Sequence, residues 1–159
     1  MRKGGVLTVI NLTLMNADEY QRYLSSAIKT YAEEKVIAGN WKEEEALKKA
    51  EEEYTRLLPQ GEKTEKNFLY TIRRDDEAVG VIWLAQKSEE LGFIYDIYIL
   101  EKYQGNGYAK EALKSIENVG QKLGLKKIGL HVFGHNKVAR GLYEKLGYET
   151  TNVLMEKDI

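Results

Sequence analysis

Residues 97–110 read IYILEKYQGNGYAK, and they join the end of an apolar strand to a glycine loop and the start of a helix. The strand pattern covers residues 91–100, whose nearly continuous apolar and aromatic character is typical of a central strand. Beyond the loop, apolar residues keep helical spacing over residues 109–123, and Gly124 is placed to end that helix. The sequence therefore predicts strand, loop and helix in direct succession.

This loop is suited to binding an anion. It directs several N–H groups of a helix N-terminus toward one point, which favours a phosphate or diphosphate. Lys102 and Lys110 add positive charge where the helix dipole alone disfavours it, and a bound anion would reverse that penalty. The alternative is that the glycines only satisfy left-handed backbone angles. The loop does not match a Walker loop, because the required Ser or Thr is missing. It does not match a dinucleotide-binding fingerprint either, because Lys110 stands in place of the third glycine.

The remaining elements follow from periodicity and turn residues. We expect one domain over residues 1–159, of the α/β (α+β) class, with a mixed, mainly antiparallel central sheet flanked by helices. The expected helices cover residues 20–31 (capped by Asn16 or Asp18 and continuing or resuming over 33–39), 42–58 and 136–146; the other expected strands cover residues 6–13, 67–73, 78–85, 127–133 and 148–155.

Composition excludes several functional classes. Hydrophobic residues make up 43% of the 159 residues and charged residues 31%, as in soluble globular domains. With 24 basic and 25 acidic residues the chain has no overall field that would attract nucleic acid or an anionic membrane, and we expect a cytoplasmic protein. It has no cysteine and two histidines, so we expect no disulfide, no acyl-cysteine and no metal site.

Charge is divided unevenly along the chain. Residues 1–100 contain 14 basic and 18 acidic residues, whereas residues 101–159 contain 10 and 7. A polyanionic ligand is therefore expected on the C-terminal third.

Two motifs together resemble the signature of the GNAT superfamily of acetyl-CoA-dependent N-acyltransferases. The first is the strand that ends at Ile99 followed by Gln104-x-x-Gly107-x-Ala109, and the second is NKVARGLYEKLGY at residues 136–148. The similarity covers roughly residues 67–157 and is greatest to small, poorly characterised bacterial members of Bacillus type.

The resemblance implies a division of the chain and a reaction. Residues 67–157 would form the acetyl-CoA-binding core and residues 14–66 a variable, helical acceptor-side region. The implied activity is direct transfer of acetyl from acetyl-CoA to a primary amine without an acyl-enzyme. A backbone N–H near Ile99 would stabilise the oxygen of the tetrahedral species. The alternative is an acyl-CoA-binding sensor or scaffold that does not turn over.

The resemblance also assigns cofactor contacts. The pantetheine arm would lie in a splayed gap beside the strand, and the diphosphate in the glycine loop. Helical offsets of three, four and seven residues place Asn136, Ala139 or Arg140, and Tyr143 on one stripe that could face this cleft. A neighbouring stripe, Val138, Leu142 and Leu146, suits the core. The cofactor-binding candidates are Ile97, Tyr98, Ile99, Gln104, Gly105, Asn106, Gly107, Tyr108, Ala109, Lys110, Asn136, Ala139 and Tyr143.

Tyr143 is the candidate general acid, because the family places a tyrosine there to protonate the departing thiolate. A phenol holds its proton at neutral pH and can share it with a sulfur anion. The alternatives are a core tyrosine for Tyr143 and a simple helix N-cap for Asn136. Gly141 lies inside the same helix. It either allows close approach of another group or is incidental there.

The amine must lose a proton, and two residues are candidates for the base. Asp96 interrupts an apolar strand and His131 lies in the next one. Each has a structural alternative: a buried carboxylate bonded to backbone or to a tyrosine, and a satisfied strand histidine. His135 is expected to be a turn residue.

On the acceptor side, Glu33 and Glu34 beside the aromatic Tyr31 and Trp41 predict attraction of a cationic amine. The sequence does not specify the acceptor, nor whether it is a small molecule or a protein. A homodimer that uses the strand expected at residues 148–155 is a further expectation.

Overall fold

A computed structural model describes residues 10–159 and contains one five-stranded sheet in this range. Its strands follow chain order: β1 (Ile10–Leu14), β2 (Asn67–Arg74), β3 (Glu77–Gln86), β4 (Leu91–Ile99) and β5 (Lys127–Leu130). The pairs β1–β2, β2–β3 and β3–β4 are antiparallel, whereas the pair β4–β5 is parallel. The helices are α1 (Ala17–Ile37), α2 (Glu43–Leu57), α3 (Tyr108–Lys122) and α4 (Lys137–Lys145). The expected mixed, mainly antiparallel sheet with flanking helices is confirmed.

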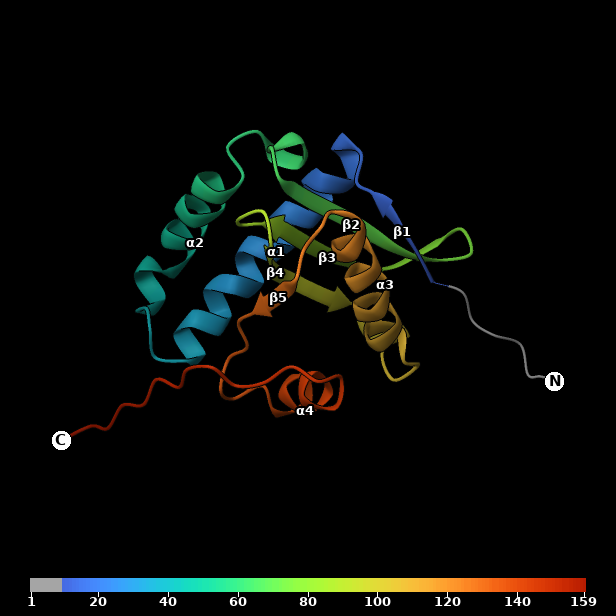
Figure 1. Cartoon of the computed structure of the whole chain (residues 1–159). Helices are drawn as coiled ribbons and strands as arrows, with labels where there is room; N and C mark the ends of the chain where they lie inside the picture. The colour runs from blue at the N-terminus through green and yellow to red at the C-terminus, as the bar shows by residue number, and fades with distance from the viewer. Residues whose placement is uncertain (1–9) are drawn as a thin grey trace.

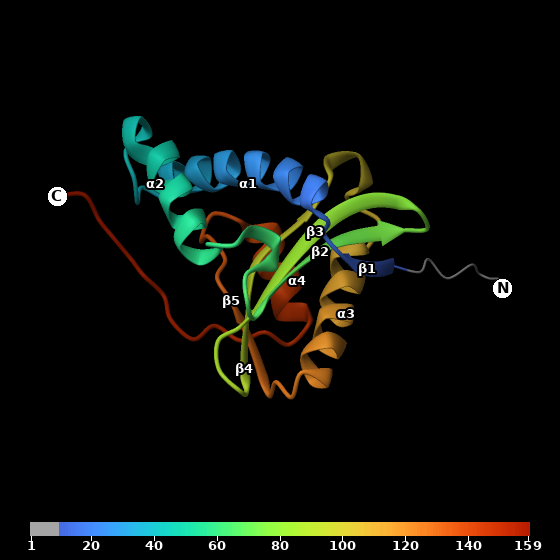
Figure 2. The same ribbon diagram turned by 90° about the horizontal axis from the view of Figure 1, so that it is seen from above.

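Helices cover both faces of this sheet (Figures 1 and 2), with α1 and α2 on one face and α3 on the other. Alternation along β3 explains the arrangement, because neighbouring side chains of a strand point to opposite faces. Ile82 and Leu84 are fully buried in the cluster that contains α3, while Trp83 between them is buried in the cluster formed with α1 and α2. Two apolar cores, one on each face, therefore hold the sheet.

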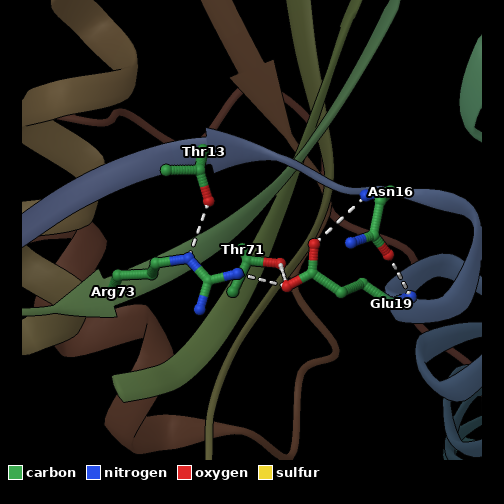
Figure 3. A network of polar contacts seen from close by, with 5 residues as sticks. All are labelled: Thr13, Asn16, Glu19, Thr71 and Arg73. Atoms are coloured by element: carbon green, nitrogen blue, oxygen red, sulfur yellow. Dashed lines mark hydrogen bonds and ion pairs between the residues drawn. The ribbon is translucent and has the colours of Figure 1, made fainter. Parts of the chain in front are cut away.

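The first turn of α1 is fixed to the paired strands β1 and β2, as Figure 3 shows. Asn16 caps the helix and forms a reciprocal capping box with Glu19. The Glu19 carboxylate also pairs with Arg73 and accepts from Thr71 on β2. Burial alone raises the pKa of Glu19, but its hydrogen bonds and Arg73 outweigh burial and lower it. This network fixes the direction in which α1 crosses the sheet.

Two expected strands differ from the structure, and part of a third lies outside the described residues, at positions 6–9. The strand expected at residues 127–133 ends at Leu130. The strand expected at residues 148–155 is wrong, because no strand follows α4. Val153, Leu154 and Met155 are 67%, 95% and 87% exposed, since no strand within residues 10–159 pairs with this segment.

Candidate functional site

A β-bulge in β4 begins the site. The register pairs Trp83 of β3 with Asp96 but Leu84 with Ile94, so Tyr95 is an extra residue. A bulge turns the strand locally and can place consecutive side chains on one face. Here the Tyr95 ring stacks on Trp83 at 4.6 Å, and Asp96 reaches Tyr23 of α1, so both side chains lie on the α1–α2 face.

Beyond the bulge, β4 loses its second neighbour. β5 pairs with residues 91–94 only, and within the described range no strand lines the other edge of residues 95–99. The Leu100 N–H donates to Val79 of β3, so the N–H and C=O of Ile99 point the opposite way, toward the open edge. The Ile99 carbonyl accepts from the Gln104 side chain at 2.8 Å, which leaves the Ile99 N–H facing the gap between β4 and β5.

The glycine loop is held by its own side chains. Gln104 donates to Ile99, and the Asn106 amide donates to the Tyr103 carbonyl at 2.9 Å. The Tyr103 hydroxyl donates to Glu77 of β3 at 2.7 Å. The Gln104 N–H donates to the Glu101 carbonyl at 3.2 Å, whereas the N–H groups of residues 105–107 have no acceptor within the described part of the chain.

Both loop glycines have left-handed backbone angles. Gly105 and Gly107 have φ of +83° and +80°, and a Cβ added to either would meet nothing within 4 Å. Gly107 caps α3, and within residues 10–159 no side chain bonds the first N–H groups of that helix. Tyr108 is buried and anchors the helix in the core, whereas Lys110 is exposed. The glycines thus meet the backbone requirement, and the space above them is open.

The start of α4 confirms the capping role of Asn136, whose side chain accepts from the Ala139 N–H at 3.1 Å. Leu142, Tyr143 and Leu146 pack against the core beneath α3. Val138, which the sequence pattern places in the core with Leu142 and Leu146, is 87% exposed, so that expectation is wrong. Tyr143, placed on the stripe that could face the cleft, packs against the core as well. The core contacts of this nine-residue helix thus lie in its C-terminal half, and none of its residues is fully buried.

Tyr143 is partly buried, and two causes raise its pKa: first burial, then the charge of Asp96. Its ring meets that of Tyr148 at 6.0 Å, and the Tyr148 hydroxyl donates to Glu117 of α3 at 3.1 Å. Tyr143 therefore holds its proton at neutral pH and is supported from α3.

Asp96 lies at the centre of these contacts. The Tyr23 hydroxyl donates to its Oδ2 at 2.7 Å. Burial raises the pKa of Asp96, and the bonds from Tyr23 and the Ile97 N–H oppose that rise in part. These are the partners that a purely structural carboxylate would also have. The charge of Asp96 also helps to raise the pKa of Tyr143, the candidate acid.

His131 lies in the segment that follows β5 and is exposed. Burial of part of its ring, followed by the charge of Lys35, lowers its pKa. Its ring contacts Phe133 edge-on at 4.9 Å, and Phe133 in turn stacks on His135. His135 is in the expected turn, where its Nε2 lies 2.5 Å from Glu34 of α1.

The four acceptor-side candidates do not form one open anionic site. Tyr31 and Trp41 meet edge-on at 5.5 Å, and the ammonium of Lys35 lies 5.6 Å and 5.2 Å from their ring centroids. Glu34 pairs with His135, and Glu33 is exposed. Lys35 thus occupies the aromatic pair, and Glu34 already has a partner in His135.

Sequence reasoning missed Tyr23 and Tyr54, which connect the helical layer to Asp96. Both are buried on the core faces of α1 and α2, where a tyrosine resembles an ordinary apolar residue. A usable signal was present: Asp96 is the sole acid in its strand and needs a donor, and a core-facing tyrosine of a covering helix can supply one.

Residues 10–159 contain neither a membrane span nor a metal centre of the usual kind. No helix there is long and apolar enough to cross a membrane, and no cluster of three acidic or histidine side chains could hold a metal ion.

Comparison with known proteins gives matches over most of the chain. The profile of the acetyltransferase (GNAT) family matches residues 27–148. The uncharacterised N-acetyltransferase YycN of Bacillus subtilis is 40% identical over 94% of this chain and 99% of its own length, and YdgE of the same organism is 31% identical over 91% and 95%.

Solved structures agree with these matches. The crystal structure of YycN superposes with a TM-score of 0.92 over 95% of this chain and 99% of that one. A GNAT family acetyltransferase from Elizabethkingia anophelis with acetyl-CoA bound, 19% identical, has a TM-score of 0.61 over 90% of this chain and 78% of that one, and so shares its fold.

Proposed function

This chain belongs to the acetyltransferase (GNAT) family, and on that premise we propose that it transfers acetyl from acetyl-CoA to a primary amine by direct attack. The observation that carries the proposal is the preorganised glycine loop at the start of α3, which adjoins a strand edge without a partner. Support comes from the two Bacillus subtilis relatives, which are named N-acetyltransferases, and from a structure of the same fold that holds acetyl-CoA.

The residues around the loop fit a diphosphate. The open space above Gly105 and Gly107 admits phosphate oxygens close to the backbone, where Cβ atoms would intrude. The N–H groups and dipole of α3, together with the exposed Lys110, supply positive character. The unpaired edge of β4 at Ile97 and Ile99 offers backbone groups to an amide-containing pantetheine arm, as an added strand would.

Acetyl-CoA supplies the acetyl group as a thioester. Three groups of the chain would then carry the transfer. The Ile99 N–H faces the gap, where it can donate to a carbonyl oxygen that gains charge. Tyr143 holds a proton for the sulfur, and Asp96 accepts the proton of the amine. The N–C bond forms first and gives a tetrahedral species, whose collapse breaks the C–S bond and releases the thiol. Both side chains return to their starting protonation states by exchange with water.

Asp96 is our choice as base over His131. Asp96 is within electrostatic reach of Tyr143, so acid and base would share one site. His131 is exposed and lies near the positive charge of Lys35, which would repel an ammonium acceptor.

Isothermal titration calorimetry with coenzyme A tests the binding half of the proposal. Gly107 and Gly124 flank α3 at its two ends, both with left-handed φ and open space at the Cβ. Aspartate tolerates this backbone region better than most residues, so Gly107→Asp and Gly124→Asp introduce similar strain and charge. We expect Gly107→Asp to weaken coenzyme A binding by at least about tenfold through repulsion of the diphosphate, and Gly124→Asp to bind normally. Equal affinities of the two variants, or no binding by the wild type, would refute the site.

A thiol-release assay with acetyl-CoA tests the transfer half. The amine panel contains polyamines, aminoglycosides, amino acids and peptide N-termini. Release with any of them, and loss of release in Gly107→Asp, supports the enzyme. Coenzyme A binding without release across the panel would instead identify an acyl-CoA sensor.

A further inference from the structure

We propose that Tyr23 of α1 is a positioning residue for the acetyl transfer: its hydroxyl holds the carboxylate of Asp96 in the orientation and charge state needed to accept the proton of the amine. This inference rests on the proposed function. It assigns a role in that reaction to the helical layer, which otherwise only covers the sheet.

The geometry is specific to one pair of atoms. Tyr23 is 7% exposed, and its hydroxyl donates to Asp96 Oδ2 at 2.7 Å across 73 positions of the chain. Asp96 reaches this donor because the bulge at Tyr95 turns its side chain to the α1–α2 face, opposite Trp83. A carboxylate has about four acceptor positions, so Oδ1 can still face the acceptor while Oδ2 is held.

A second tyrosine packs beside the first. Tyr54 of α2 lies in the same buried cluster as Tyr23, and it is itself 7% exposed. After burial and the charge of Asp96, Tyr54 adds to the causes that raise the pKa of Tyr23. Tyr23 therefore keeps the hydroxyl proton that it donates to Asp96.

Tyr23 is the main group that opposes the cost of burying the charge. The titratable groups facing Asp96 are Tyr23 from α1, Tyr54 from α2 and Tyr143 from α4, and all of them are neutral phenols. None of the ion pairs within residues 10–159 includes Asp96. Burial raises the pKa of Asp96, and only the Tyr23 bond and the Ile97 N–H lower it. Loss of the Tyr23 hydroxyl should therefore protonate Asp96 at a higher pH.

The test is the pH profile of kcat/KM for Tyr23→Phe with an amine that the wild type acetylates. We expect the acid limb to move up by about one pH unit, because a hydrogen bond to a charged group is lost. The KM for acetyl-CoA should stay within about threefold of the wild type. The plateau at high pH, where Asp96 ionises in both proteins, should fall by up to about tenfold, because the carboxylate is no longer held in one orientation. Tyr70→Phe is the matched control: Tyr70 is a half-buried tyrosine whose pKa is raised by burial alone.

A substitution that preserves shape gives the opposite shift. Site-specific incorporation of 3,5-difluorotyrosine at Tyr23 makes the phenol a stronger donor, so the acid limb should move to lower pH. Opposite shifts in the two variants cannot arise from damaged packing. The fluorinated protein also keeps the test valid if Tyr23→Phe fails to fold.

Carbon NMR titration of the Asp96 carboxyl, assigned by its absence in Asp96→Asn, gives the same comparison without any acceptor. An unchanged Asp96 titration in both Tyr23 variants would overturn the inference. So would a pH profile whose acid limb is lost in His131→Gln, because the limb would then report His131 rather than Asp96. Coenzyme A binding and thiol release by the wild type are measured separately and would stand after either result. Failure of this inference is therefore distinct from failure of the proposed function.

Discussion

Asp96 and Tyr143 pack on opposite faces of the sheet. Asp96 bonds to α1 on one face, whereas Tyr143 packs with the α3 core on the other. The charge of Asp96 nevertheless acts on Tyr143, whose pKa it helps to raise. The negative charge of one helps the other to keep its proton, a division of roles that suits a base and an acid.

Replacement of Tyr143 by Phe should separate chemistry from binding. The phenol proton is lost while most of the ring packing remains, so kcat should fall by about 10²-fold or more. The Kd for coenzyme A should change by less than about threefold, because Tyr143→Phe leaves the glycine loop intact. Steady-state kinetics combined with calorimetry measures both quantities. A large loss of affinity with normal turnover would show that Tyr143 is a binding residue rather than the acid.

Replacement of Asp96 by Asn should stabilise the fold at neutral pH while it abolishes transfer. Burial raises the folded-state pKa of Asp96 above its ordinary value of 3.8, so the ionised carboxylate opposes folding. The penalty is absent below pH 3.8, grows as pH rises toward the folded-state pKa, and is constant above it. Urea unfolding at a series of pH values should show an advantage of Asp96→Asn that increases across this window. The exposed Asp76→Asn should show no such trend, and an Asp96→Asn protein less stable than wild type at neutral pH would contradict the argument.

At the scale of elements, α3 and α4 differ in how well the sequence specifies them. The predicted bounds of α3 are correct to one residue, because Gly107 and Gly124 adopt left-handed angles at its two ends. The pattern of α4 also predicts its bounds, yet the expected core position of Val138 is wrong. A periodic pattern shows which residues share a face, but it does not show how much of that face the rest of the protein covers.

Gly141 gives a prediction about α4. Its φ is ordinary and a Cβ there would meet nothing within 4 Å, so no group of the described chain approaches it closely. Gly141→Ala should therefore raise the free energy of unfolding by about 0.5–1 kcal/mol, the usual gain for this change inside a helix. Denaturant unfolding measures this gain. Should Gly141→Ala instead weaken coenzyme A binding with stability unchanged, the glycine would be there to admit the ligand.

The bulge and the final segment show where sequence patterns stop being informative. Residues 91–100 predict a strand, and β4 covers 91–99, but the extra residue in its register depends on the partner strand β3, where Trp83 pairs with Asp96. Likewise, residues 148–155 have strand-like composition and find no partner strand. Both outcomes depend on pairing, which is a property of two segments rather than one.

At the scale of the whole molecule, two polar contacts join α1 to later parts of the chain. Tyr23 joins α1 to β4, and Glu34 of α1 meets His135 just before α4. The sequence predicts the layers through helix periodicity, but it cannot predict these pairings across 73 and 101 positions. The site residues on β4 and the loop were accessible to motif reasoning because they are contiguous in the chain.

The Glu34–His135 contact should contribute modestly to stability. Both side chains are about one-third exposed, so Glu34→Gln should lower the free energy of unfolding by no more than about 1 kcal/mol. Glu33→Gln, one position away and exposed, is the control and should be neutral. Thermal unfolding in low and high salt checks this, since screening by about 1 M salt should remove most of the difference. A difference that persists in high salt would point to a neutral hydrogen bond.

The shallow attachment of α4 has a practical consequence. This helix has no fully buried residue, so it should be among the first parts of the fold to detach on warming. A compound that bridges the N-terminal ends of α3 and α4 would oppose that detachment, and at about 100 times its Kd it would add about 2.7 kcal/mol to the folded state. Melting-point screens against thioester libraries could thus rank acyl donors before any amine is known.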